Sequence, residues 1–206
     1  MRIISGTSKG RKLVTPRGYS LRPTSDRMKE SIFNILGKEV EDKVVLDLFA
    51  GTGNLGIEAL SRGAKKAFFV ETGRQALQLI QKNLARCGVE GQSEIVPEDT
   101  TRAIGMLKQK REVFDLILID PPYGKGMVQK TLERLNSQKI YHEGSILVVQ
   151  HDRREPVSET TGRWNLFRQR RMGDTLISFL TPRLSTPAAT GEDEQHRVDP
   201  AERKEK

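Results

Sequence analysis

The chain has 206 residues, with 35 lysines and arginines against 27 aspartates and glutamates and a formal net charge of +8 at pH 7. This length can bury the core of one ordinary domain, and no apolar run approaches the roughly 20 residues that cross a membrane. Cys87 is the only cysteine, which excludes an internal disulfide and a cysteine metal cluster. Residues 1–6 lack the apolar stretch of a signal peptide, so we expect a cytoplasmic protein without membrane contact.

The basic charge is concentrated near the N-terminus. Residues 1–27 hold seven lysines and arginines against one acid, Asp26. A basic segment attracts polyanions through counterion release, which favours nucleic acid as a partner, although solubility alone would also account for the charge. Short strands are predicted at residues 2–4 and 12–14 around a turn, so we interpret residues 1–24 as an arm or small hairpin.

A helix is predicted after this arm. Ser25 or Asp26 can cap its first turn, and Gly37 is placed to end it. Apolar residues recur with the spacing of one helical face: Met28, Ile32, Ile35 and Leu36. We assign the arm and this helix to a basic RNA-binding segment, residues 1–42.

Strands and helices alternate from residue 43 onward. Strands are predicted at residues 43–48, 66–71, 94–97, 114–119 and 145–150. Helices are predicted at residues 55–62, 104–107 and 127–135, and at residues 73–87 with Thr72 as the cap. Two last strands, residues 166–172 and 176–180, flank the hairpin signal Gly173-Asp174.

This alternation predicts an α/β fold of the Rossmann-like type. We expect residues 43–183 to form a seven-stranded, mostly parallel sheet with helices on both faces and a C-terminal antiparallel hairpin. Ligands of such sheets bind at the carboxyl ends of the first strands. Residues 184–206 are polar and charged, and they predict a disordered tail.

A glycine-rich turn follows the first predicted strand of the sheet. Residues 51–56, Gly-Thr-Gly-Asn-Leu-Gly, match G-x-G-x-x-G, which by itself also fits a dinucleotide site. Asp47 precedes the turn and would repel a pyrophosphate, whereas it would attract the ammonium and sulfonium groups of S-adenosylmethionine. Glu71 ends the second strand and is placed to bind ribose hydroxyls. Asp99 is placed either to accept from adenine or to cap a helix.

The segment Asp120-Pro-Pro-Tyr follows the most apolar strand. Its two prolines stiffen the backbone and leave acceptors, the Asp120 carboxylate and the Pro121 carbonyl. Two acceptors on the N–H bonds of an exocyclic amino group would orient its lone pair for attack on a methyl group and would stabilise the developing positive charge. Tyr123 offers a flat face on which a flipped base can stack.

These two motifs together resemble class I S-adenosylmethionine-dependent methyltransferases that act on amino nitrogens. More specifically, the chain resembles the bacterial 16S rRNA guanine-N2 methyltransferases of the RsmD type from residue 2 to about residue 179. Besides the two motifs, the resemblance includes residues 2–4, 10–13, 21–27, 56–64 and 173–175. It implies methylation of guanine 966 in 16S rRNA on assembling small ribosomal subunits, by a monomer.

The resemblance also implies a role for individual residues. The residues that would bind S-adenosylmethionine are Asp47, Phe49, Gly51, Gly53, Glu71, Asp99 and Thr100. The residues that would catalyse transfer are Asp120, Pro121 and Tyr123. The residues that would bind the RNA are Arg11, Arg22, Thr24, Arg27 and Pro122. No metal is expected, because the three histidines lack ligand spacing with one another.

Three alternative functions stay open from the sequence. The Asp120-Pro-Pro-Tyr segment also suits methylation of another amino nitrogen, such as adenine N6 in nucleic acid or a protein glutamine. A non-catalytic RNA-binding protein with a vestigial cofactor fold is less favoured, because Asp120 and Tyr123 are both present. A nicotinamide-dependent dehydrogenase is the least favoured, because Asp47 suits a phosphate-bearing cofactor poorly.

Overall fold

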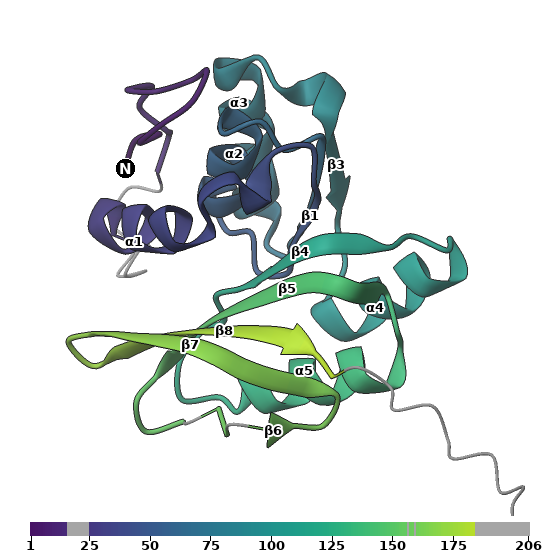
Figure 1. Cartoon of the computed structure of the whole chain (residues 1–206). Helices are drawn as coiled ribbons and strands as arrows, with labels where there is room; N and C mark the ends of the chain where they lie inside the picture. Colours follow the sequence, from purple (N-terminus) through teal and green to yellow (C-terminus); the bar gives the residue numbers. More distant parts are fainter. Residues whose placement is uncertain (16–24, 156, 159, 184–206) are drawn as a thin grey trace, which may run out of the picture.

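In the part of the chain that the structure describes, eight strands form one sheet in the order β3-β2-β1-β4-β5-β8-β7-β6 (Figure 1). This computed structural model describes residues 1–15, 25–155, 157–158 and 160–183. The strands are β1 (Val44–Asp47), β2 (Lys66–Val70), β3 (Ser93–Val96), β4 (Phe114–Ile119), β5 (Tyr141–Asp152), β6 (Thr160–Thr161), β7 (Trp164–Met172) and β8 (Thr175–Pro182).

The strand directions confirm the predicted α/β topology. Strands β3, β2, β1, β4 and β5 run parallel, and β8 pairs antiparallel with both β5 and β7. Order reverses at β1, so the carboxyl ends of β1 and β4 flank the switch point where ligands of such sheets bind. The seven predicted strands are all present, and the two-residue β6 extends the edge beyond β7 without having been predicted.

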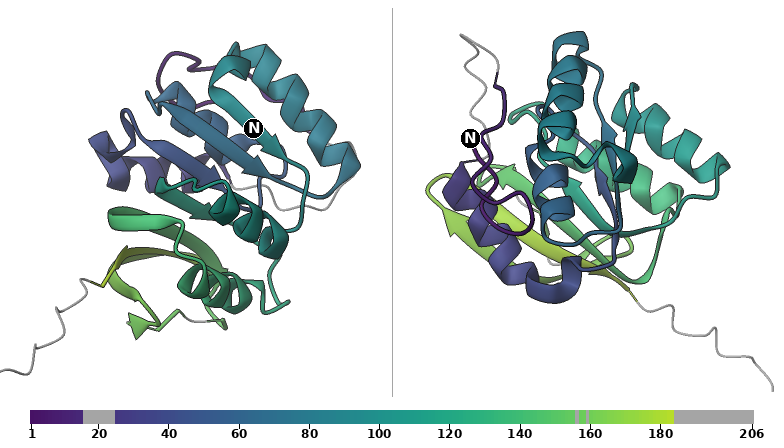
Figure 2. Two further views of the ribbon diagram at one scale, coloured as in Figure 1. Left: turned by 90° about the vertical axis from the view of Figure 1, so that its right-hand side faces the viewer. Right: turned by 90° about the horizontal axis from the view of Figure 1, so that it is seen from above.

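Helices cover both faces of the sheet (Figures 1 and 2). They are α1 (Asp26–Leu36), α2 (Asn54–Ser61), α3 (Arg74–Cys87), α4 (Thr100–Gln109) and α5 (Met127–Ser137), with short 3₁₀ helices η1 (Gly37–Val40) and η2 (Glu90–Gln92). Side chains of α1, α2 and α3 share one buried cluster with the sheet, and side chains of α4 and α5 share another. Alternate residues of β4 enter the two clusters, Leu116 and Leu118 one, Ile117 and Ile119 the other, as the pleat requires.

The helix ends agree with the predicted caps except at α3. Ser25 caps α1 by accepting a hydrogen bond from the Met28 amide at 3.1 Å, and Gly37 ends that helix as predicted. The prediction that Thr72 caps α3 was wrong, because the helix begins one residue after Gly73. The N-cap residue is Gly73, without a side-chain cap, and the Glu71 carboxylate accepts from the amides of Thr72 and Gly73 just before the helix, each at 2.8 Å.

The N-terminal arm is packed on the sheet domain. Its two predicted strands are reduced to one antiparallel bridge between Arg2 and Lys12. Ile3 and Leu13 are buried in the same cluster as side chains of α1, α2 and α3. The arm therefore shares the core of the fold, while its role in RNA binding and the boundary at residue 42 stay predictions. The predicted tail, residues 184–206, lies outside the described residues.

Candidate functional site

A broad cavity of about 1790 Å³ lies at the carboxyl ends of β1, β2 and β4. Among the predicted site residues, those that line it are Arg27, Asp47, Phe49, Gly51, Glu71, Asp99, Thr100, Asp120, Pro121, Pro122 and Tyr123. Gly53 does not line it, although its neighbours Thr52 and Asn54 do. The cavity exceeds the usual volume of a small-ligand pocket, about 300–1,000 Å³, so it has room for a nucleotide-sized cofactor and part of a second ligand.

Two predicted RNA-binding residues, Arg22 and Thr24, lie outside the described residues. Arg11 is away from the cavity: its guanidinium donates to the Arg86 carbonyl near the C-terminal end of α3. Helix α3 begins beside the cavity and has 14 residues, so its far end is about 20 Å away. The structure thus brings Arg27 to the cavity and leaves Arg11 at a distance, and both RNA contacts stay predictions.

Asp47 ends β1 with a buried carboxylate. One oxygen accepts a hydrogen bond from the Gly56 amide at 3.0 Å, which holds the start of α2. The other, Oδ1, has no hydrogen-bond partner among the described residues. Burial raises the pKa of Asp47 from 3.8 to about 7, and the charges of Asp120 and Glu71 raise it further. The Gly56 hydrogen bond and, to a smaller extent, the Phe49 backbone lower it. A cationic ligand group would supply the hydrogen bond that this oxygen lacks.

The glycines of residues 51–56 serve the turn and the packing of α2. Gly51 and Gly53 have φ angles of 55° and 80°, the left-handed region that side chains disfavour. A Cβ on Gly56 would lie 2.3 Å from Cε1 of Phe69 on β2, so only glycine allows α2 to approach the sheet this closely. The Gly51 amide also donates to Glu71 Oε2 at 2.9 Å, which joins the turn to the end of β2.

Asp99 and Thr100 both have structural contacts at the cavity wall. Asp99 caps α4, because its Oδ1 accepts from the amides of Thr101 and Arg102 at 3.0 and 3.1 Å. The Thr100 hydroxyl donates to the Leu48 carbonyl at 3.0 Å and fixes α4 to the end of β1. The helix-cap alternative for Asp99 is therefore present, and the adenine contact stays a prediction.

The Asp120-Pro-Pro-Tyr segment leaves β4 next to Asp47, since β4 and β1 are parallel neighbours. The charge of Asp120 raises the pKa of Asp47, so the two carboxylates lie close enough to interact. Tyr123 lies 3.4 Å from the Thr175 hydroxyl, oxygen to oxygen, at the start of β8. The Glu155 carboxylate accepts from the amides of Gly124 and Gly126, each at 3.2 Å. The C-terminal part of the sheet thus holds this loop.

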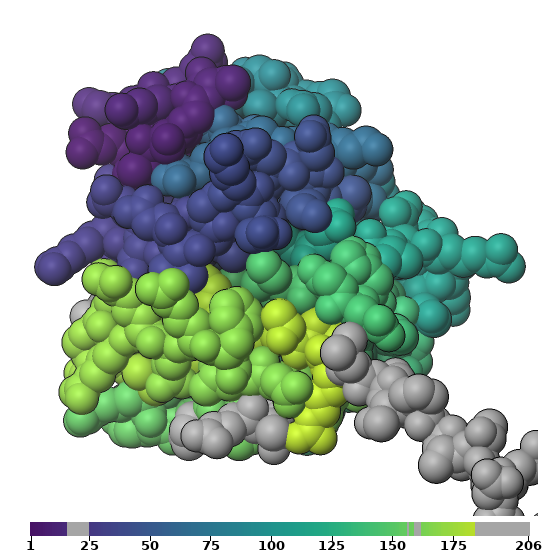
Figure 3. All heavy atoms as spheres, in the orientation of Figure 1, coloured from purple at the N-terminus to yellow at the C-terminus, as the bar shows by residue number. Residues whose placement is uncertain are grey.

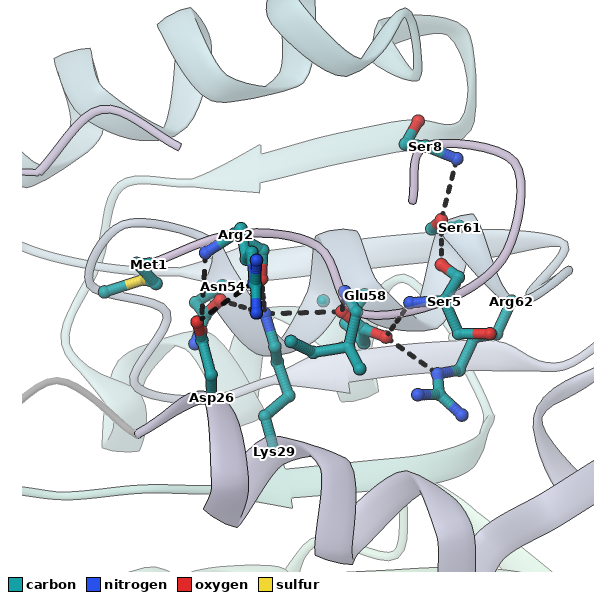
Figure 4. A network of polar contacts seen from close by, with 12 residues as sticks. Met1, Arg2, Ser5, Ser8, Asp26, Lys29, Asn54, Glu58, Ser61 and Arg62 are labelled. Carbon is teal, nitrogen blue, oxygen red and sulfur yellow. Dashed lines mark hydrogen bonds and ion pairs between the residues drawn. The ribbon is translucent and has the colours of Figure 1, made fainter. Parts of the chain in front are cut away.

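The sequence analysis missed a buried ion pair beside the glycine-rich turn (Figure 4). Lys29 of α1 lies 3.3 Å from Glu58 of α2, Nζ to Oε2, and both side chains are fully buried. Lys29 also donates to the Asn54 side chain and the Arg2 carbonyl, each at 2.6 Å. Burial lowers the pKa of Lys29, and the Glu58 charge partly restores it.

The face of α1 that is fully buried therefore differs from the predicted one. Lys29, Ile32, Phe33 and Leu36 are buried, whereas Met28 and Ile35 are only partly buried. The prediction chose Met28 because it is apolar, but Lys29 has the right spacing, three and four residues before Ile32 and Phe33. The position of Lys29 on the apolar face was the sequence feature that could have indicated a buried ion pair.

Glu58 and Asn83 fasten the N-terminal arm to the cofactor side of the fold. The Glu58 carboxylate accepts from the amides of Ile4 and Ser5 at 2.8 and 3.1 Å (Figure 4). Asn83 of α3 exchanges hydrogen bonds with the Val14 backbone and donates to the Thr52 carbonyl at 2.9 Å. The arm, the glycine-rich turn and α3 therefore form one hydrogen-bonded unit.

Known proteins resemble the chain over nearly its whole described length. The family model for conserved hypothetical protein 95 matches residues 1–181. The putative rRNA methyltransferase YlbH of Bacillus subtilis is 36% identical over 89% of this chain and 100% of its own length. The ribosomal RNA small subunit methyltransferase D of Escherichia coli K12 is 34% identical over 84% of this chain and 85% of its own. The solved structure of the putative methyltransferase yhhF from Escherichia coli superimposes with a TM-score of 0.79 at 30% identity, covering 89% of this chain and 98% of that one.

Within the described residues, no helix is long and apolar enough to cross a membrane. Among those same residues, no three histidine, cysteine, aspartate or glutamate side chains are grouped so that they could hold a metal ion.

Proposed function

Because the chain belongs to the conserved hypothetical protein 95 family of RsmD-type S-adenosylmethionine-dependent methyltransferases, we propose that it methylates the exocyclic N2 of a guanine in 16S rRNA. The guanine that the sequence resemblance favours is guanine 966, in assembling small ribosomal subunits. We further propose that the enzyme acts as a monomer in the cytoplasm.

One observation carries the proposal. Asp47 and Asp120 end neighbouring parallel strands and face one cavity, in which Asp47 Oδ1 is buried without a partner among the described residues. A buried acceptor of this kind suits the ammonium group of S-adenosylmethionine, and a phosphate-bearing cofactor would be repelled. The residues present therefore fit this cofactor.

The chain's own residues would then position the acceptor nitrogen. S-adenosylmethionine supplies an electrophilic methyl group on a sulfonium. The Asp120 carboxylate and the Pro121 carbonyl would accept hydrogen bonds from the guanine N2 amino group and stabilise positive charge on that nitrogen during attack. The ring of Tyr123 would stack on the extruded base, and Pro122 would border it. Asp120 would accept the proton that N2 releases or pass it to water.

We expect the affinity for S-adenosylmethionine to rise with pH near neutrality. Asp47 has a pKa of about 7 in the free protein, so it is mostly neutral at pH 6 and mostly charged above pH 7.5. A cation binds the charged form better, and the dissociation constant should fall by up to about tenfold per pH unit on the acidic side of the pKa. Isothermal titration calorimetry between about pH 6 and pH 7.5 measures this, and proton release on binding should accompany it.

Asp47→Asn is the matched variant for that measurement. It keeps an acceptor for the Gly56 amide but has no titrating group, so its weaker binding should be independent of pH over the same range. A wild-type affinity that does not change with pH would show that Asp47 does not bind the cation.

The proposed reaction is tested with 16S rRNA and small-subunit particles from cells that lack their own N2 methyltransferase. Mass analysis of the nucleosides should find N2-methylguanosine, and primer extension should place it at guanine 966. N6-methyladenosine, or label found only in protein, would favour the alternative of another amino nitrogen, which the Asp120-Pro-Pro-Tyr segment also suits. Stabilisation by NAD and not by S-adenosylmethionine in a thermal shift would overturn the cofactor assignment.

A further inference from the structure

Charges around the cavity are separated by sign. The acids at the carboxyl ends of the first strands are Asp47, Glu71, Glu98, Asp99 and Asp120. The cations that line the cavity come from α1, β7 and the loop after Tyr123, and they are Arg27, Lys125, Arg168, Arg170 and Arg171. Glu30 of α1 is the acid that lines the cavity among these cations. A cationic cofactor and a polyanionic substrate would therefore prefer different parts of the same cavity.

The arginines of β7 project toward the side of the sheet that α1 covers. Arg168 pairs with Phe179 and Arg170 with Ile177 across the antiparallel β7–β8 ladder. Directly opposed residues point to the same face, and Phe179 and Ile177 lie in the buried cluster that includes α1. In the view of Figure 3, the surface of β7 (yellow-green) lies next to that of α1 (blue). Arg168 and Arg170 are exposed, and both line the same cavity as Arg27.

The guanidinium groups of Arg27, Arg168 and Arg170 have no counterion within the described part of the chain, a property that most other described arginines share. By contrast, Arg62 and Arg154 each pair with an acid, at 2.8 and 2.9 Å. Arginine binds phosphate oxygens through two parallel hydrogen bonds. Arginines without an acid partner that line one cavity therefore fit the backbone of a nucleic acid strand.

An exposed aromatic ring adjoins the arginines. The register of β7 shifts between Leu166 and Arg168, so Phe167 is an additional residue in the strand. Its ring lies 6.2 Å from that of Phe179, centroid to centroid, and the residue is 52% exposed. Single-stranded RNA is bound by stacking of unpaired bases on such rings next to arginines.

We propose that Phe167, Arg168 and Arg170 of β7, together with Arg27 of α1, form a clamp for the RNA strand that flanks the target guanine. The arginines contact phosphates on either side of the flipped nucleotide, and Phe167 stacks on a neighbouring unpaired base. The acids at the strand ends repel the backbone, so only the base reaches Asp120. This inference rests on the proposed RNA substrate and adds a binding surface on the C-terminal hairpin to it.

The test compares two double variants that each remove two positive charges. Arg168→Ala/Arg170→Ala removes half of the clamp. Lys65→Ala/Lys139→Ala removes two exposed lysines, one directly before β2 and one two residues before β5, at the end of the sheet opposite the cavity. We expect the arginine variant to bind 16S rRNA fragments roughly tenfold more weakly and to lower the slope of log affinity against log salt by about 1 to 2. Its KM for RNA should rise, while its affinity for S-adenosylmethionine and its thermal stability stay at the wild-type level.

Phe167 is tested separately because stacking does not depend on salt. Phe167→Leu should weaken RNA binding without changing the salt slope, and Phe167→Tyr should bind as the wild type does. Equal RNA affinity of the arginine variant and the wild type would overturn the clamp, as would an equal loss in the lysine control. A wild-type enzyme that methylates no RNA would instead overturn the proposed function, so the two failures are distinguishable.

Discussion

Asp120→Ala is expected to lower kcat for methyl transfer by about 10²–10³-fold, the usual effect of removing one preorganised group that stabilises transition-state charge. The alanine has no acceptor for the guanine amino group, and the nitrogen loses the carboxylate that favours its positive charge. Single-turnover methylation of 16S rRNA with labelled S-adenosylmethionine measures the chemical step. The affinity for S-adenosylmethionine should change little at pH 8, where Asp47 is mostly charged with or without the Asp120 carboxylate.

Two further variants define the role of Asp120. Asp120→Asn keeps one acceptor oxygen and loses the charge, so its rate should lie between those of the wild type and the alanine variant. Glu133→Ala removes a carboxylate from the exposed surface of α5 and should leave the rate unchanged. Full methylation by Asp120→Ala would refute the proposed mechanism.

Glu58→Gln is expected to destabilise the protein by about 3–5 kcal/mol, because it leaves the charge of Lys29 buried without its counterion. This loss should lower Tm by roughly 10 °C in a chain of this size. Urea unfolding followed by circular dichroism gives the free energy directly. Lys29→Met combined with Glu58→Gln removes both buried charges and should be more stable than Glu58→Gln alone.

The ion pair between Lys66 and Glu94 provides the control for burial. Its atoms are closer, 2.8 Å apart, but the two side chains are 41% and 32% exposed. Glu94→Gln should therefore lower the free energy of unfolding by less than about 1 kcal/mol, as is usual when a surface ion pair is removed. If Glu58→Gln lowers the free energy of unfolding no more than Glu94→Gln does, the buried ion pair stabilises the protein no more than a surface pair.

Most of the fold could be predicted because its signals are local. Residues 114–119 are almost wholly apolar, and they form β4 with those same bounds. The alternation of strands and helices, together with right-handed crossovers, leaves few possible strand orders. Strand β6 has two residues and no pattern of its own, so it depends on pairing with β7 and could not be predicted.

The site was predicted in part, and the limit is again physical. Asp47 and Asp120 end apolar strands, so topology alone brings them together. The Lys29–Glu58 pair joins residues on two helices, and neither residue by itself indicates its partner. Arg168 and Arg170 alternate along a strand and so share a face, but only the packing of α1 beside β7 places them at the cavity.

The contacts of the N-terminal arm also set an order of events during synthesis. The arm is synthesised well before its partners: the Ser8 hydroxyl donates to the Cys87 carbonyl at 3.2 Å, and the Val14 amide donates to the Asn83 side chain. Asn83 also fixes Thr52 of the glycine-rich turn. Until α3 has been made, both the arm and the turn therefore lack these partners, and the cofactor pocket can form completely only afterwards.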